Sequence, residues 1–155
     1  MEKIHRLLYP MRVCLITSRL GDKENIMAAS WTFPLSMDPP LFGVSVAEKR
    51  YSHDLIKKGN GFGINLPNPR LEEAVVICGT KSGRDTDKFA EAGFSRDEGK
   101  RVPLIKECPV SIECELVDEI KTGNHTLFVG RAIDVRNRFQ DRGLYQVRGM
   151  EFTAV

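Results

Sequence analysis

Residues 25–52 decide the fold, and they read N-I-M-A-A-S-W-T-F-P-L-S-M-D-P-P-L-F-G-V-S-V-A-E-K-R-Y-S. The pattern predicts two strands, Ile26–Phe33 and Leu41–Val46, separated by a break at Pro34 and at Asp38-Pro39-Pro40. One face of the first strand carries Ile26, Ala28, Ser30 and Thr32, and the other carries Met27, Ala29, Trp31 and Phe33. Because small side chains replace the branched ones usual in a buried strand, we expect the first face to leave room for a flat ligand.

The same stretch ends in Glu48-Lys49-Arg50-Tyr51-Ser52, directly before a predicted helix at Ser52–Lys58. Two cations and a hydroxyl at a helix amino terminus are typical of an anion site, because the first backbone amides have no acceptor inside the helix. In the alternative interpretation, Ser52 is only a helix cap and Arg50 only a surface charge.

The composition is that of a soluble globular protein with 41% hydrophobic and 28% charged residues. We expect one domain over residues 1–155, since a chain of this length can bury a sizeable core. No apolar run approaches the roughly 18 residues of a membrane span, and no signal-peptide core follows the first residues. We therefore expect a cytoplasmic protein with no membrane partner. The net charge of +2 also gives no reason to expect nucleic acid as a partner.

The cysteines and histidines do not form a metal-binding pattern. The four cysteines contain no C-x-x-C, and the three histidines are isolated from one another in the sequence. We therefore expect no metal site and four reduced cysteines in the core. These cysteines are Cys14, Cys78, Cys108 and Cys114.

The rest of the chain predicts short elements joined by turns. Strands are expected at Val13–Ser18, between Gly59 and Leu66, at Val110–Ile120, at His125–Val135, and as one closing strand within Leu144–Val155. Helices are expected from an Asn68 cap to Gly79, from an Asp85 cap to Gly93, and at Ser52–Lys58 with Gly59 at its carboxyl end. Residues 94–107 are rich in charge and turn formers, which predicts an exposed connection.

The strand at Val110–Ile120 and the strand at His125–Val135 are separated by turn residues, which predicts a long antiparallel hairpin. In its first strand we expect Val110, Ile112, Cys114 and Leu116 to point inward, and Ser111, Glu113 and Glu115 to point outward. The glycines at 59–63 follow G-x-G-x-G between a helix and a strand, which excludes a Rossmann loop. The elements together predict an antiparallel barrel or sandwich.

Six short motifs resemble the flavin reductase-like, FMN-binding split-barrel family, and especially its flavoredoxin and archaeal ferric reductase branch. They are N-x-M-x-x-S-W at 25–31, D-P-P at 38–40, R-Y-S-H-D-L-I at 50–56, G-F-G-I-N-L-P at 61–67, S-G-R-D-T-D-K-F at 82–89 and G-N-H at 123–125. Each is weak alone, but their order and spacing are specific. The resemblance implies a mainly β, antiparallel Greek-key split barrel with short peripheral helices, and a homodimer that binds FMN near the subunit interface.

FMN has a phosphate, a flat ring with hydrogen-bonding edges, and a ring atom, N5, that accepts hydride. Arg50 and Ser52 suit the phosphate, and the helix amino terminus adds about 0.3–1 kcal/mol. Nanomolar binding needs about 12 kcal/mol, so most of it must come from the ring. The residues expected to bind the cofactor are Asn25, Ser30, Trp31, Thr32, Ser45, Arg50, Ser52, Ser82 and Lys88.

Two residues are expected to take part in catalysis. Lys88 would place positive charge beside N1 and the C2 carbonyl of the flavin, where reduction creates negative charge. His125 would contact the flavin edge or an incoming nicotinamide. The alternatives are that Lys88 is a solvated helix lysine, that His125 is an exposed hairpin histidine, and that Trp31 is a core residue.

The expected activity is hydride transfer from NADH or NADPH to bound FMN, followed by electron transfer to free flavin, a ferric chelate or a partner redox protein. A second hypothesis is a flavoredoxin-type electron carrier without NAD(P)H activity of its own. A third is a flavin-storage or purely structural barrel. The sequence does not separate NADH from NADPH, because no residue can be assigned to the ribose 2′ position.

Overall fold

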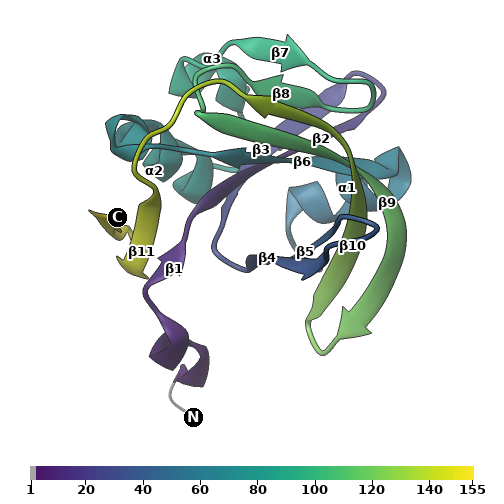
Figure 1. The fold of residues 1–155 in the computed structure, drawn as a ribbon, viewed down its shortest axis with the longest axis horizontal. Coiled ribbons are helices and arrows are strands. Elements are labelled where there is room, and N and C mark those ends of the chain that lie inside the picture. Colours follow the sequence, from purple (N-terminus) through teal and green to yellow (C-terminus); the bar gives the residue numbers. More distant parts are fainter. Residues whose placement is uncertain (1–2) are drawn as a thin grey trace.

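The computed structural model describes residues 3–155 and is built around one seven-stranded antiparallel sheet (Figure 1). Its strands, in spatial order, are β3 (Lys23–Ala29), β2 (Cys14–Leu20), β6 (Gly61–Leu66), β9 (Val110–Thr122), β10 (His125–Asn137), β5 (Leu41–Ala47) and β4 (Thr32–Ser36). β3 and β4 are the two edges of this sheet, yet only Ser30 and Trp31 separate them in the chain. The sheet must therefore curl until its edges meet at these two residues. No ladder joins β3 to β4, so the barrel is split along this seam, as expected.

The prediction of one strand over Ile26–Phe33 is wrong, because the chain changes from one sheet edge to the other at Ser30 and Trp31. The Trp31 carbonyl accepts a hydrogen bond from the Ser45 amide at 2.9 Å, which ties the connection to β5. Pro34 does not end a strand either. It lies within β4, where an edge strand tolerates a residue that has no amide proton.

Alternating side chains of the curled sheet point to its two faces, where they form two hydrophobic clusters. Inside the barrel, Ile16, Phe62 and Phe128 pack with Ile56 of α1 (Tyr51–Gly59). On the other face the second cluster packs beneath α2 (Glu72–Thr80) and α3 (Lys88–Ala92). Its members include Leu15, Ile26, Val75, Phe89 and Ile105. All four cysteines are buried and free, which confirms the expected core role.

The remaining elements are short. They are η1 (Ile4–Leu8), β1 (Met11–Arg12), η2 (Pro69–Leu71), β7 (Arg96–Glu98), β8 (Pro103–Ile105), β11 (Leu144–Arg148) and β12 (Glu151–Ala154). β7 and β8 form a two-stranded sheet, and β1, β11 and β12 form a three-stranded one. The tail is therefore a hairpin paired with β1, not the single closing strand that was expected.

Residues 94–107 are not the exposed connection that was predicted. Val102, Leu104 and Ile105 are fully buried, and the β7–β8 hairpin covers part of β9. Glu113 on β9 was expected to face solvent but is fully buried, and it accepts hydrogen bonds from the amides of residues 100–102 at 2.7–3.0 Å. The prediction failed because local alternation cannot show that a distant hairpin covers a polar face.

Ser111 was also expected to point outward, yet it is fully buried and its hydroxyl donates to Asn65 Oδ1 at 2.7 Å. Several helix ends differ from expectation as well. Asn60, in the left-handed region at φ 59°, ends α1 in place of Gly59. Asp87, not Asp85, caps α3 by accepting hydrogen bonds from two amides. Asn68 precedes η2 without a side-chain cap, and its amide nitrogen donates instead to Asp141 at 2.9 Å.

Within residues 3–155, no helix is long and apolar enough to cross a membrane. The same residues contain no group of three or more histidine, cysteine or carboxylate side chains that could hold a metal ion.

Candidate functional site

Two adjoining cavities, with volumes of about 320 and 570 Å³, share residues of β3 in their linings. Five residues line both cavities, so they form one cleft: Met27, Ala28, Lys49, Arg50 and Gly79. Its combined size falls in the range of about 300–1,000 Å³ usual for small-molecule sites. The seam residues Ser30 and Trp31 line the larger cavity, so the cleft lies at the split of the barrel.

The smaller cavity is an electropositive site at the amino terminus of α1. Its lining contains five basic residues and no acidic one: Lys49, Arg50, Lys81, Arg84 and Lys88. Arg50 occupies the N-cap position without a side-chain cap, so the first amides of the nine-residue helix have no intrahelical acceptor. The amides and cations together favour a bound anion.

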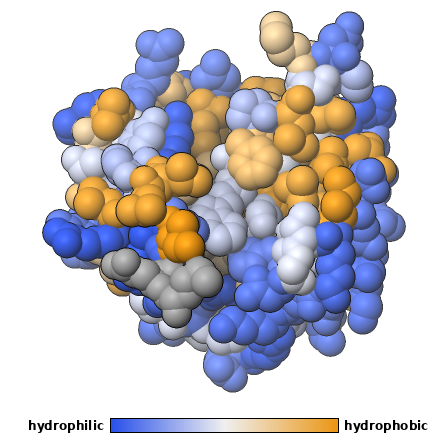
Figure 2. All heavy atoms as spheres, turned by 90° about the horizontal axis from the view of Figure 1, so that it is seen from below, coloured by the Kyte–Doolittle hydropathy of each residue, from blue (hydrophilic) through white to orange (hydrophobic). Residues whose placement is uncertain are grey.

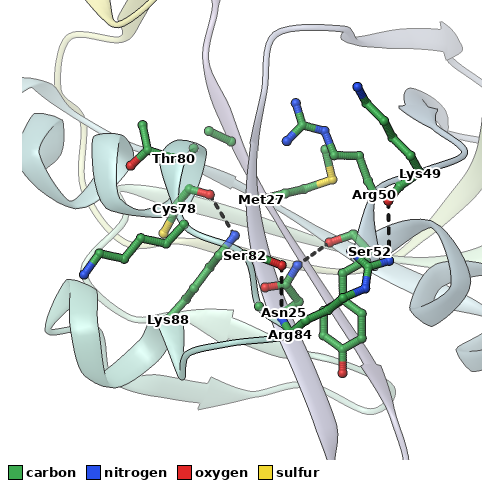
Figure 3. Close-up of a pocket in the computed structure, with 15 residues that line it drawn as sticks. Asn25, Met27, Lys49, Arg50, Ser52, Cys78, Thr80, Ser82, Arg84 and Lys88 are labelled. Atoms are coloured by element: carbon green, nitrogen blue, oxygen red, sulfur yellow. Dashed lines mark hydrogen bonds between the residues drawn. The ribbon is translucent and has the colours of Figure 1, made fainter.

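Ser52 was predicted to cap α1 but lies inside the helix, fully buried. Its hydroxyl accepts a hydrogen bond from Asn25 Nδ2 at 2.9 Å, which leaves the Ser52 proton free to donate (Figure 3). Asn25 Oδ1 is buried and has no partner among residues 3–155. The backbone of Gly83 packs onto this atom so closely that an added Cβ would overlap it.

Lys88 crosses from α3 to the wall of the smaller cavity (Figure 3). Its ammonium donates to the carbonyls of Ile26 at 2.7 Å and Cys78 at 2.8 Å, and the residue is only 5% exposed. Burial lowers its pKa below the usual value, and the nearby Arg50 charge lowers it further. The alternative of a solvated helix lysine is therefore wrong. The Lys88 ammonium is therefore held in place by two of its three N–H donors, and the third remains available for a ligand.

An aromatic group forms one wall of the larger cavity. The rings of Trp31 and His125 stack at 4.8 Å with 29° between their planes, and His5 meets Trp31 edge-on at 5.4 Å. Trp31 Nε1 donates to the Tyr9 hydroxyl at 3.2 Å. Burial is the main cause that lowers the pKa of His125, with smaller effects from Arg50 and His5. A neutral imidazole therefore stacks against the face of the indole at neutral pH.

The structure places nine of the ten predicted site residues on the cleft. Asn25, Ser52, Ser82 and Lys88 line the smaller cavity, Ser30, Trp31, Ser45 and His125 line the larger one, and Arg50 lines both. Thr32 lies outside both cavities, because it begins β4 on the far side of the seam.

The sequence did not predict that residues near both ends of the chain line the larger cavity. His5 and Tyr9 reach the larger cavity from the amino-terminal segment, and Gln146, Met150 and Phe152 reach it from the β11–β12 hairpin. None of them stands in a recognisable motif. The pairing of β1 with β11 brings both ends to the seam.

The family described as "Flavin reductase like domain" matches residues 5–153 of this chain. The chain belongs to this flavin reductase-like family. An uncharacterized protein of Pyrococcus abyssi is 45% identical over 131 residues, which cover 83% of this chain and 75% of that protein. The ferric-chelate reductase (NAD(P)H) of Archaeoglobus fulgidus is 28% identical over 136 residues, with 86% and 78% covered.

Solved structures agree with this assignment. An FMN-binding protein from Thermus thermophilus, solved with p-hydroxybenzaldehyde, superposes with a TM-score of 0.87 at 28% identity, covering 95% of this chain and 87% of that one. A flavoredoxin of Desulfovibrio vulgaris (Miyazaki F) has the same identity and coverage and a TM-score of 0.85. The split-barrel fold and the family are therefore secure.

Proposed function

We propose that this family member binds FMN in the cleft, accepts hydride from NADH or NADPH, and passes electrons to free flavin, a ferric chelate or a redox partner. The observation that supports this most is the continuity of a basic, amide-lined cavity with a larger cavity walled by a stacked aromatic pair. A phosphorylated ligand with a flat ring needs both at once. The NAD(P)H-dependent relative supports the donor.

The residues of the cleft fit the two chemical parts of FMN. Arg50, Lys49 and the free proton of Ser52 suit a phosphate, and the lining of the smaller cavity contains no carboxylate to repel it. Ser30, Trp31 and Ser45 would hold the ring in the larger cavity. When bound, FMN would supply the hydride acceptor and pass on the two electrons that it receives from NADH or NADPH, so the chain itself need not provide a nucleophile.

Lys88 and His125 have different roles in this proposal. Lys88 is a fixed positive charge on the wall of the smaller cavity, because two carbonyls hold its ammonium in place. A cation positioned in advance stabilises negative charge without reorganising, and at this wall it would face the phosphate end of the ligand, not the N1 and C2 carbonyl edge that was expected. His125 stacks on Trp31 in the wall of the larger cavity, where it would contact the flavin edge or an incoming nicotinamide.

A homodimer is part of the same proposal. Several large apolar side chains are exposed, among them Met37 at 96%, Leu7 at 83% and Leu8 at 75%. Figure 2 shows hydrophobic residues gathered on both sides of a paler hollow on the face that carries the amino-terminal segment. Light scattering after size-exclusion chromatography should give twice the mass of one chain, and a Met37→Glu variant should weaken the association.

The decisive experiment is anaerobic. Purified protein is loaded with FMN, and flavin absorbance is followed after mixing with NADH or NADPH. Bleaching in repeated turnovers with an acceptor supports the reductase. Bleaching only with a reduced protein donor supports the flavoredoxin-type carrier, which the superposed flavoredoxin makes the second candidate. Failure to bind FMN contradicts both. Arg50→Gln should weaken FMN binding by about tenfold or more, since a charge-assisted hydrogen bond contributes about 1.5–3 kcal/mol.

A further inference from the structure

Ser30 and Gln146 form a hydrogen-bonded pair at the seam, on the wall of the larger cavity. The Ser30 hydroxyl donates to Gln146 Oε1, and Gln146 Nε2 donates to the Gly149 carbonyl at 2.5 Å. The second bond fixes the orientation of the amide, because the flipped amide would place two carbonyl oxygens against each other. Gln146 therefore presents an acceptor to Ser30 and no donor.

This orientation limits what Ser30 can offer a ligand. A serine hydroxyl has one proton and two lone pairs, and here the proton is used by Gln146. The Ser30 oxygen can then only accept a hydrogen bond in the larger cavity, which both residues line. A ligand group at this point must be an N–H or O–H donor. A carbonyl there would leave two acceptors facing each other.

We propose that Gln146 is a positioning residue that holds Ser30 as a hydrogen-bond acceptor, so that the cleft selects a flat ligand with a ring N–H at the seam. The inference rests on the proposed function, because oxidised flavin has a single ring N–H, at N3 between two carbonyls. Gln146 thus determines which edge of the ring the seam recognises. The β11–β12 hairpin that carries it is part of the recognition site, not only a cover.

The test uses FMN labelled with ¹⁵N and the full-length protein. In the complex, the N3 proton should shift downfield and exchange slowly with water relative to free FMN. Ser30→Ala should return this signal toward that of free FMN. Gln146→Leu should do the same in part, because the Ser30 hydroxyl is then free to rotate. Gln146→Glu should preserve the signal only in part, since a carboxylate still accepts the Ser30 proton but sets its second oxygen against the Gly149 carbonyl.

A double-mutant cycle separates positioning from general hairpin stability. Each single variant, Ser30→Ala or Gln146→Leu, should weaken FMN binding by about 2- to 10-fold, the range for one ordinary hydrogen bond. If Gln146 acts through Ser30, the double variant should be no weaker than Ser30→Ala alone. Unfolding midpoints of all variants provide the control for misfolding.

Two results would overturn the proposal. One is an N3 signal that Ser30→Ala leaves unchanged. The other is that Gln146→Leu weakens FMN binding by the same factor in the wild-type protein and in the Ser30→Ala variant. Both are measured on protein that binds FMN, so they do not contradict the proposed function. Failure of the wild-type protein to bind FMN would contradict the proposed function itself.

Discussion

Replacing Lys88 by methionine should destabilise the protein more than any change to an exposed lysine. The two carbonyls that accept its hydrogen bonds have few alternatives, because Cys78 lies in the last turn of α2 and Ile26 lies on the edge strand β3. Each buried acceptor left unpaired costs about 1–3 kcal/mol. Removing a buried charge recovers part of this cost. We therefore expect a loss of about 2–4 kcal/mol in the free energy of unfolding.

Urea unfolding followed by circular dichroism measures this loss. The matched control is Lys81→Met, because Lys81 is exposed and only pairs with Glu91 at 3.1 Å on the surface. That change should cost less than about 1 kcal/mol. A Lys88→Met loss no larger than that of Lys81→Met would refute the structural reasoning.

The pH dependence gives a second readout for Lys88. Its folded-state pKa is lowered from 10.5, chiefly by burial, so above the lowered value the unfolded chain binds more protons than the folded one. Wild-type stability should gain a rising contribution as pH increases from that lowered pKa to 10.5, and Lys88→Met should lack it. Identical pH profiles for the two proteins would contradict the burial of the ammonium.

Three further predictions follow from the same structure. Gly83→Ala should weaken FMN binding without unfolding the protein, because the new methyl group would displace the backbone that packs on Asn25; fluorescence titration of FMN checks this, and unchanged affinity would contradict it. Folded His125 has a lowered pKa, so stability should fall as pH drops below 6.5, and His125→Asn should reduce that fall in urea unfolding at pH 7.5 and 5.5. Glu113→Gln should lower the free energy of unfolding by about 2–4 kcal/mol, because one amide oxygen replaces a carboxylate that accepts three backbone hydrogen bonds. A loss below about 0.5 kcal/mol in urea unfolding would be evidence against this role.

Local patterns predicted most of the elements. The long hairpin of β9 and β10, the strand β5 and the first helix α1 lie within a few residues of their expected positions. These signals depend on neighbours along the chain, such as alternation and turn chemistry. The errors share one cause. The break at Ser30 and Trp31 and the burial of Glu113 depend on contacts with distant segments.

The candidate site divides in the same way. Arg50 and Ser52 could be found because a helix start leaves a local signature, and Ser30 and Trp31 because of their motif. The role of Ser52 could not be found, since its partner Asn25 lies 27 residues away. The fixed position of Lys88 was missed for a similar reason: its acceptors are 62 and 10 residues distant.

The sequence alone determined that this chain forms an antiparallel β protein with a small-residue strand followed by a basic helix start, and its motifs identified the flavin reductase-like family. Only the tertiary structure decided that β3 and β4 are opposite edges of one curled sheet, and that both chain ends wall the larger cavity. The physical reason is that hydrogen-bond ladders and burial join residues far apart in the chain. A cleft at a sheet seam exists only once those ladders have formed.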